Sequence, residues 1–257
     1  SITSYVYTKG VDQFPVCTQY GFEFLGWAYE NNPDSIITSI GKTEYGDINL
    51  VARWTGDAVV PPQDKDGCYL VSSVGELYGV SEIKADKMCV KLMKDIVINV
   101  DMDLEDEFHL RDWYGLYGFN GVFDGQGHTI SGMYDHGLFT DVLEGDTLVI
   151  KNLGIEESHV INQGRSVFVR SNRGVVIIDS CFSSFPSGGF VESNNGHLYV
   201  SNSYNTGSIY TGSSIVSTNN GVAVLDHVYN TGTVNCSGGL LGSNSGKAFI
   251  SNSYNVG

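Results

Sequence analysis

The sequence predicts an all-β protein built around a parallel β-solenoid, a chain wound into stacked coils of short strands. A short polar phrase returns three times, as SNSYNTG at 201–207, HVYNTG at 227–232 and SNSYNVG at 251–257. Turns that end in glycine recur at Gly174, Gly196, Gly221 and Gly246. The 257 residues include 32 glycines and five prolines. That composition is typical of many short strands joined by tight turns.

Residues 1–55 form the first predicted domain. The runs FEFLGW at 22–27 and DINLVARW at 47–54 place apolar side chains at alternating positions, which predicts at least two strands. We expect Trp27 and Trp54 to share a small core, and a platform on which carbohydrate stacks is the alternative.

The segment YGFEFLGWAYE, followed by IITSIGKTEYGDINLVARW, resembles the Listeria-Bacteroides repeat, the B-repeat of internalin-type surface proteins. It departs from that pattern at Phe22, where tyrosine is usual, and at Ala28. The resemblance implies a small β-grasp-like fold of the kind found in extracellular bacterial proteins, usually as a spacer or stalk.

A linker and a cap follow this domain. Residues 56–67 concentrate Pro, Gly and Asp without periodicity, which predicts the linker. Ser73 and Glu76 have the spacing of a capping box, so we expect a short helix over 73–84 that caps the solenoid. Alternating apolar residues predict a strand over 90–102.

Residues 68–257 form the predicted solenoid. Its glycine-terminated turns are spaced by 22, 25 and 25 residues, and an alternating apolar run with a final aromatic residue follows each turn. A period of this length without a helix indicates that each repeat supplies one coil. We expect the final aromatic residues to stack as a ladder, and the Asn and Gly after them to make a corner. These aromatic residues are Phe182, Tyr204, Tyr229 and Tyr254.

The solenoid segment resembles the GLUG-motif family of large secreted or surface-anchored bacterial proteins, which includes some adhesins and immunoglobulin A peptidases. The resemblance is carried by NGVFDGQGHTISGMYDHGLF at 120–139, LVIKNLGIEESHV at 148–160 and the SNSYNTG units. The usual Gly-Gly-Leu-Val-Gly appears only once, as GGLLG within 238–246. The resemblance implies a right-handed parallel β-helix, and we expect its carboxy end to be truncated from a longer parent chain.

Charge excludes some partners. The net charge is −15, and residues 55–146 hold eighteen of the 29 acidic side chains. An acidic chain disfavours a nucleic-acid or anionic-membrane partner. No apolar run approaches the roughly 20 residues of a membrane span, so we expect no membrane insertion.

The segment DMDLEDEFHLRD at 101–112 is the densest acidic run. Asp101, Asp103 and Glu105 share a face if the chain is extended, and clustered oxygens are what calcium binds. We expect a solvated acidic loop here and no bound cofactor, and a calcium site is the alternative. No other cofactor is predicted.

Catalytic signatures are weak. HExxH, GxSxG and P-loop motifs do not occur. Asp179 and Asp226 fall two coils apart on one face with Ser201 between them, and we expect this face to be solvated rather than catalytic. In FDGQGHTI we expect a tight turn capped by Asp124, rather than a general base at His128.

Five cysteines, an odd number, show no spacing typical of metal ligands. We expect them to be buried thiols, and a Cys68–Cys89 disulfide is the alternative. The cysteines are Cys17, Cys68, Cys89, Cys181 and Cys236.

The function predicted from these observations is a non-catalytic part of a cell-surface or secreted bacterial adhesin-like protein, a stalk with a glycan-binding or protein-binding surface. The alternative is a carbohydrate-active β-helix enzyme, or an accessory region of a large secreted enzyme. Polar and aromatic side chains aligned along the coils are the candidate contact face. The alternative is that they only satisfy the corners and exposed flanks of the coils. These side chains are Tyr204, Asn205, Tyr229, Asn230, Tyr254 and Asn255.

Overall fold

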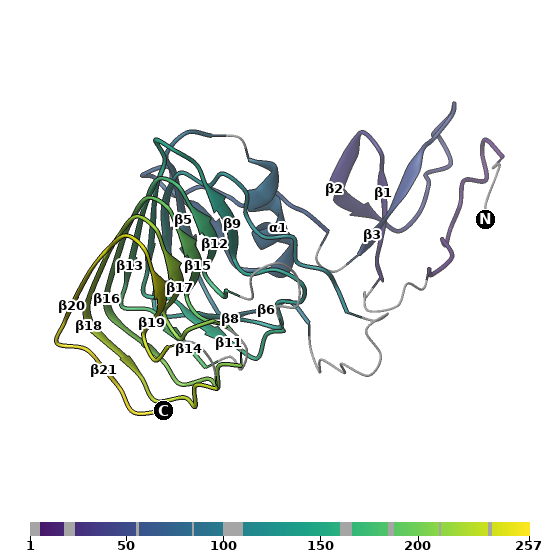
Figure 1. Cartoon of the computed structure of the whole chain (residues 1–257). Coiled ribbons are helices and arrows are strands. Elements are labelled where there is room, and N and C mark those ends of the chain that lie inside the picture. The colour runs from purple at the N-terminus through teal and green to yellow at the C-terminus, as the bar shows by residue number, and fades with distance from the viewer. Residues whose placement is uncertain are drawn as a thin grey trace.

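A computed structural model of the chain describes residues 6–17, 24–54, 57–83, 85–99, 110–159, 166–184, 188–210, 212–235 and 238–257. A parallel β-solenoid of about seven turns forms most of it, and a small antiparallel sheet precedes the solenoid (Figure 1). The predicted solenoid is therefore confirmed.

The small sheet has the strand order β2-β1-β3 and is antiparallel. Its strands are β1 (Phe24–Tyr29), β2 (Asn32–Ile37) and β3 (Leu50–Trp54). The ring of Phe24 contacts Trp27 and Trp54 edge to face, at centroid distances of 5.9 and 5.2 Å. The two tryptophans thus pack on one shared ring, although both side chains stay partly exposed. The described part of residues 6–54 contains no helix, so the β-grasp-like fold stays a prediction.

The cap begins within the predicted linker. The backbone N–H of Val59 donates to the carbonyl of Gly75 in α1 (Val74–Glu82), and Gly79 lies against Val59 with no room for a β-carbon. Ser73 is the N-cap of α1, as predicted, and accepts the N–H of Glu76. The helix buries Leu77 in the core of the solenoid, so linker and helix together cover its amino-terminal end.

Each coil of the solenoid contributes strands to three faces. The first face contains β4 (Tyr69–Val71), β5 (Met88–Leu92), β7 (Gly121–Asp124), β10 (Thr147–Lys151), β13 (Val175–Asp179), β20 (Lys247–Ser251) and the first halves of β16 (His197–Asn205) and β18 (Val222–Asn230). The second contains β6 (Ile96–Val97), β8 (Thr129–Ser131), β11 (Gly154–Glu156), β14 (Phe182–Ser183), β21 (Tyr254–Asn255) and the second halves of β16 and β18. The third contains β9 (Phe139–Val142), β12 (Val169–Asn172), β15 (Val191–Asn194), β17 (Val216–Asn219) and β19 (Leu241–Asn244).

Alternating apolar residues produce this architecture because every second side chain of a strand points into the coil. In β13, for example, Val176 and Ile178 are fully buried while Ile177 between them is partly exposed. The parallel strands keep strict register from coil to coil. Equivalent residues therefore form columns along the solenoid.

The chain turns after each tyrosine, as expected, since β16 ends at Asn205, but the left-handed backbone expected there lies at the corner between the first and second faces. The left-handed backbone lies at Asn202 and Asn252, with φ of 48° and 49°, two residues before each tyrosine rather than after it. His227 takes the same place with φ of 53°. The glycines after the tyrosines serve close approach instead, since a β-carbon on Gly232 would lie 2.0 Å from the carbonyl oxygen of Gly207.

The single strand expected over 90–102 is two strands, because the chain turns through Met93–Asp95 between β5 and β6. This turn is the first corner of the solenoid. Residues 100–109 lie outside the described part of the chain.

Candidate functional site

The predicted aromatic ladder is present on the second face. Phe182, Tyr204, Tyr229 and Tyr254 stack in succession with centroid distances of 5.3, 4.9 and 5.3 Å. The angles between successive ring planes are 9°, 3° and 7°. Parallel pairing of β14, β16, β18 and β21 brings the four residues into register. Aromatic pairs contribute about 0.5–1.5 kcal/mol beyond their burial, so the ladder stabilises the coils.

The stack leaves little open ring surface for a ligand. Tyr204 lies between two rings, and so does Tyr229. The first ring, Phe182, covers Gly154 of the preceding coil, where an added β-carbon would lie 2.4 Å from the ring. Tyr254 is 51% exposed and stacks on one side only among the described residues. A sugar that stacks on a ring needs an open face, so the two inner tyrosines present edges and hydroxyls instead.

Asn205 and Asn230 lie inside the coil, which corrects the expectation that they belong to a contact face. Both are 0% exposed. The Asn205 amide donates to the Asn230 side chain at 2.7 Å, and the Asn230 amide donates to Asn255 at 2.6 Å. Each amide also donates to the glycine carbonyl two residues on. These asparagines connect coils, and only Asn255, in the last strand, is exposed.

A second asparagine ladder follows the third face. Its successive side chains are joined by amide hydrogen bonds of 2.7 Å. The members are Asn172, Asn194, Asn219 and Asn244. Each of the first three also donates to a first-face carbonyl of the next coil at 3.0 Å. The signal in the sequence is an Asn two residues before each turn glycine. Asparagine is also common in turns, so its position alone does not indicate a ladder.

Asp179 and Asp226 stand in one outward column with Ser201 between them, as predicted. Ser201 Oγ donates to Asp179 at 2.6 Å, and the amide of Asn202 donates to the same carboxylate at 2.8 Å. Asp226 receives the equivalent pair from the next coil, at 2.7 and 2.8 Å. Hydrogen bonds to the ionised form lower the pKa of both acids, that of Asp226 from 3.8 to about 2. Neither carboxyl is poised to donate a proton near neutral pH.

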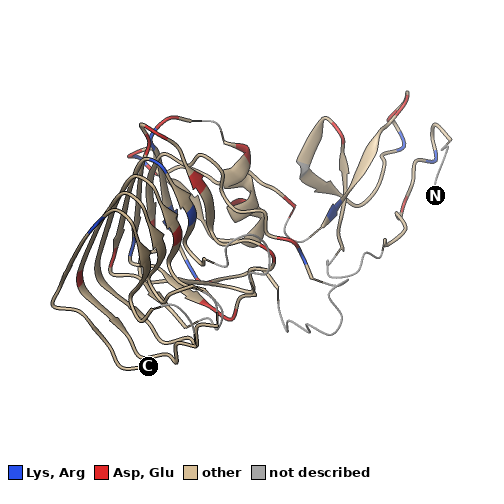
Figure 2. Cartoon of the chain, viewed as in Figure 1, with Lys and Arg blue, Asp and Glu red and all other residues tan. Residues whose placement is uncertain are grey.

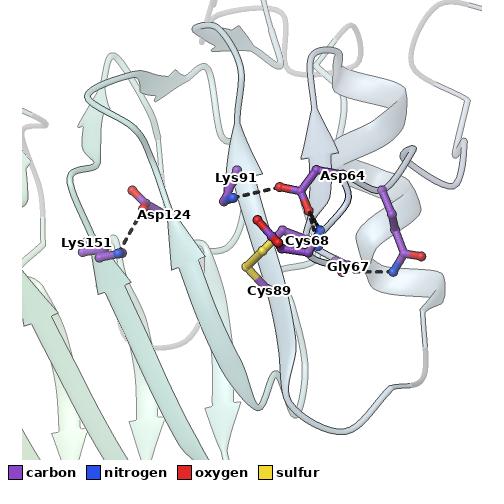
Figure 3. The surroundings of a disulfide bond; sticks show 9 residues. Asp64, Gly67, Cys68, Cys89, Lys91, Asp124 and Lys151 are labelled. Carbon is purple, nitrogen blue, oxygen red and sulfur yellow. Dashed lines mark hydrogen bonds and ion pairs between the residues drawn. A yellow bond between two sulfur atoms is a disulfide. The ribbon is translucent and has the colours of Figure 1, made fainter.

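Toward the amino end this column continues as residues of alternating charge. Nζ of Lys151 lies 3.1 Å from Asp124, and Nζ of Lys91 lies 2.8 Å from Asp64 (Figure 3). The hydrogen bond from Lys91 lowers the pKa of Asp64 to about 2. Few charged residues lie on the later coils (Figure 2).

The FDGQGHTI run forms the predicted tight turn. Asp124 accepts the N–H of Gln126 at 3.0 Å, and Gln126 has φ of 54°. Nδ1 of His128 lies 3.1 Å from Asp95, whose carboxylate also accepts the N–H of Thr129. The contacts of Asp95 join this corner to the corner of the preceding coil.

Cys68 and Cys89 form a disulfide between the first two coils, which corrects the expectation of buried thiols for this pair (Figure 3). Cys181 is a buried free thiol, and burial raises its pKa to about 12. Cys17 is free and partly exposed. Cys236 lies outside the described residues.

The predicted calcium ligands Asp101, Asp103 and Glu105 also lie outside the described residues. In the part of the chain that is described, no group of three or more His, Cys, Asp or Glu side chains is arranged to hold a metal ion.

A surface that the sequence did not single out lies on the first face. One outward column there is apolar in six successive coils, and we call it the outer apolar column. It consists of Val122, Val149, Ile177, Tyr199, Val224 and Phe249. Tyr199 is 42% exposed and Phe249 is 59% exposed. An aromatic residue at the same place in HLYVSNSY and KAFISNSY was the signal in the sequence.

The fold and these ladders define the class of the protein: a parallel β-solenoid whose repeated side chains bond from coil to coil. Among solved structures, the chain is similar to that of a "putative immunoglobulin A1 protease" from Bacteroides ovatus. The TM-score is 0.54 and the identity 15%, over 75% of this chain and 68% of that one. At this identity the likeness concerns the fold alone. No family model and no curated protein matches the chain.

Proposed function

We propose that this chain is a non-catalytic part of a bacterial cell-surface or secreted adhesin-like protein, a stalk that also presents a contact surface. One observation carries the proposal: the repeated polar side chains are bonded to the next coil. The Asn194 amide, for example, donates to the side chain of Asn219 and to the carbonyl of Val222. Side chains whose hydrogen bonds go to the next coil stiffen the solenoid and are not free to act on a substrate.

The arrangement of the aspartate and glutamate side chains supports a non-catalytic function. A hydrolase of the pectinase type needs a proton donor beside a second carboxylate. Asp179 and Asp226 have lowered pKa values. The pKa of Glu192 is raised by burial, yet Glu192 lies in β15 on the third face, beside Arg170. These acids do not form a pair with opposed pKa shifts.

The extracellular location is part of the proposal. Disulfides form and persist mainly in oxidising compartments, so the Cys68–Cys89 bond supports it. Within the described residues, no helix is long and apolar enough to cross a membrane. A partner among glycans or the proteins of a host or neighbouring cell fits a chain with a net charge of −15 better than nucleic acid does.

The test is an activity screen of the protein against pectin, cellulose, chitin and immunoglobulin A1, with reducing ends and released peptides as readouts. The proposal expects no product above the buffer control. Product released by the protein and lost in Asp179→Asn or Asp226→Asn would show that the chain is an enzyme instead.

A further inference from the structure

We propose that the outer apolar column binds a neutral, extended β-1,4-linked polysaccharide that lies along the solenoid axis. The inference rests on the proposed function, because it identifies the ligand class of the contact surface. It moves that surface from the aromatic ladder of the second face to the first face.

Two exposed aromatic rings, those of Tyr199 and Phe249, lie in the outer apolar column. Tyr199 and Phe249 occupy one register position two coils apart, with Val224 between them. Coils are stacked at about 4.8 Å, so the two rings are separated by about 10 Å along the axis. Among the described residues neither ring stacks on another aromatic ring. Tyr199 is 42% and Phe249 59% exposed, so both rings keep more solvent-exposed surface than the half-buried Tyr204 and Tyr229 do.

This spacing suits one kind of glycan. In an extended β-1,4-linked chain each pyranose is turned over relative to the last, so the same face recurs at every second sugar. That repeat is close to the height of two coils. The apolar C–H face of one sugar can stack on Tyr199 and that of the next but one on Phe249, while the sugar between them lies over Val224.

Charge selects a neutral ligand. The outer apolar column has no charged side chain, and the adjacent outward column contains Lys247 but no acid. Few charged residues lie on these later coils, so the surface offers a polyanionic glycan few cations to pair with (Figure 2). On the other side of the column, Asp179 and Asp226 supply carboxylate oxygens that can accept hydrogen bonds from sugar hydroxyls.

The experiment is calorimetry of the whole protein with cellohexaose and chitohexaose, with α-linked maltohexaose as the geometric control. Tyr199→Ala and Phe249→Ala should each weaken binding roughly tenfold or more, as the loss of an aromatic anchor does. Tyr254→Ala truncates a tyrosine of intermediate exposure, 51%, on another face and should change the affinity less than twofold. Circular dichroism checks that each variant is folded.

Three outcomes would overturn the inference: folded protein that binds neither β-linked hexasaccharide, equal affinity for maltohexaose, or binding lost only in Tyr254→Ala. Sugars released from the hexasaccharides are measured separately. Release of sugars would contradict the non-catalytic function but not the binding site. If the protein neither binds nor cleaves the hexasaccharides, the binding site is contradicted and the proposed stalk function is not.

Discussion

The ring of Phe182 lies over the backbone of Gly154 in the preceding coil, where an added β-carbon would stand 2.4 Å from Cζ of the ring. The aromatic ladder therefore begins on a glycine. Any side chain at that place would have to displace the first ring of the stack.

Gly154→Ala should lower the free energy of unfolding by about 1–3 kcal/mol, the usual cost of overpacking. Chemical denaturation measures it. The control is a double-mutant cycle. In a Phe182→Ala background the clash with the ring is removed and only the milder one with Thr129 Cγ2, at 2.9 Å, remains, so the cost of Gly154→Ala should shrink. An unchanged cost would show that the ring does not lie on Gly154.

Asn219→Ala removes the centre of a buried ladder. The substitution leaves the Asn194 amide without one acceptor and the Lys247 carbonyl without its side-chain donor. Each buried group left unsatisfied costs about 1–3 kcal/mol. Asn220→Ala, next in the chain but exposed, should stay within about 0.5 kcal/mol of the parent. Equal effects of the two variants would contradict the ladder.

The Cys68–Cys89 disulfide closes a loop with a sequence separation of 21. Its removal in a Cys68→Ser/Cys89→Ser variant should cost about 3 kcal/mol, from the chain entropy of such a loop. Hydrogen exchange should increase first in β4 and α1, which lie at that end of the solenoid. Cys17→Ser, at a free cysteine, is the control and should have no such effect.

Acid should weaken the fold through its hydrogen-bonded carboxylates. The pKa of Asp226 falls from 3.8 to about 2 because of hydrogen bonds from Ser251, Asn252 and His227. A lowered carboxyl pKa adds stability that is complete above about pH 4 and lost as the pH falls toward 2. Asp226→Asn should therefore flatten the melting temperature between pH 5 and pH 2, relative to the exposed control Glu144→Gln. Parallel curves for the two variants would contradict the contacts of Asp226.

Much of this structure followed from periodicity. Glycine-terminated turns and alternating apolar residues predict the coils, their register and the stacked aromatic residues, because identical repeats must place identical side chains one above another. The start of helix α1 was also predictable, because Ser73 and Glu76 have the local spacing of a capping box.

The error about Asn205 came from the position of the left-handed backbone. The prediction placed it at Asn205, after Tyr204, whereas the left-handed residue is Asn202. Alternation from that bend points Tyr204 outward and Asn205 inward, so a shift of three residues turned a buried ladder into an expected surface. Asparagine is common both in left-handed turns and in buried ladders, and residue type alone cannot separate the two. The disulfide likewise depended on register, which places Cys68 beside Cys89 on neighbouring strands.

The central claim is that repeated polar side chains serve the next coil rather than a ligand. The most direct measurement is side-chain amide exchange by NMR at Asn194, Asn205, Asn219 and Asn230, compared with the exposed Asn195 and Asn220. The account predicts that the four buried amides remain protected long after the exposed pair has exchanged. If all six exchanged equally fast, the ladders would not hold these amides. The central claim would then be contradicted, and the side chains would be available to a ligand.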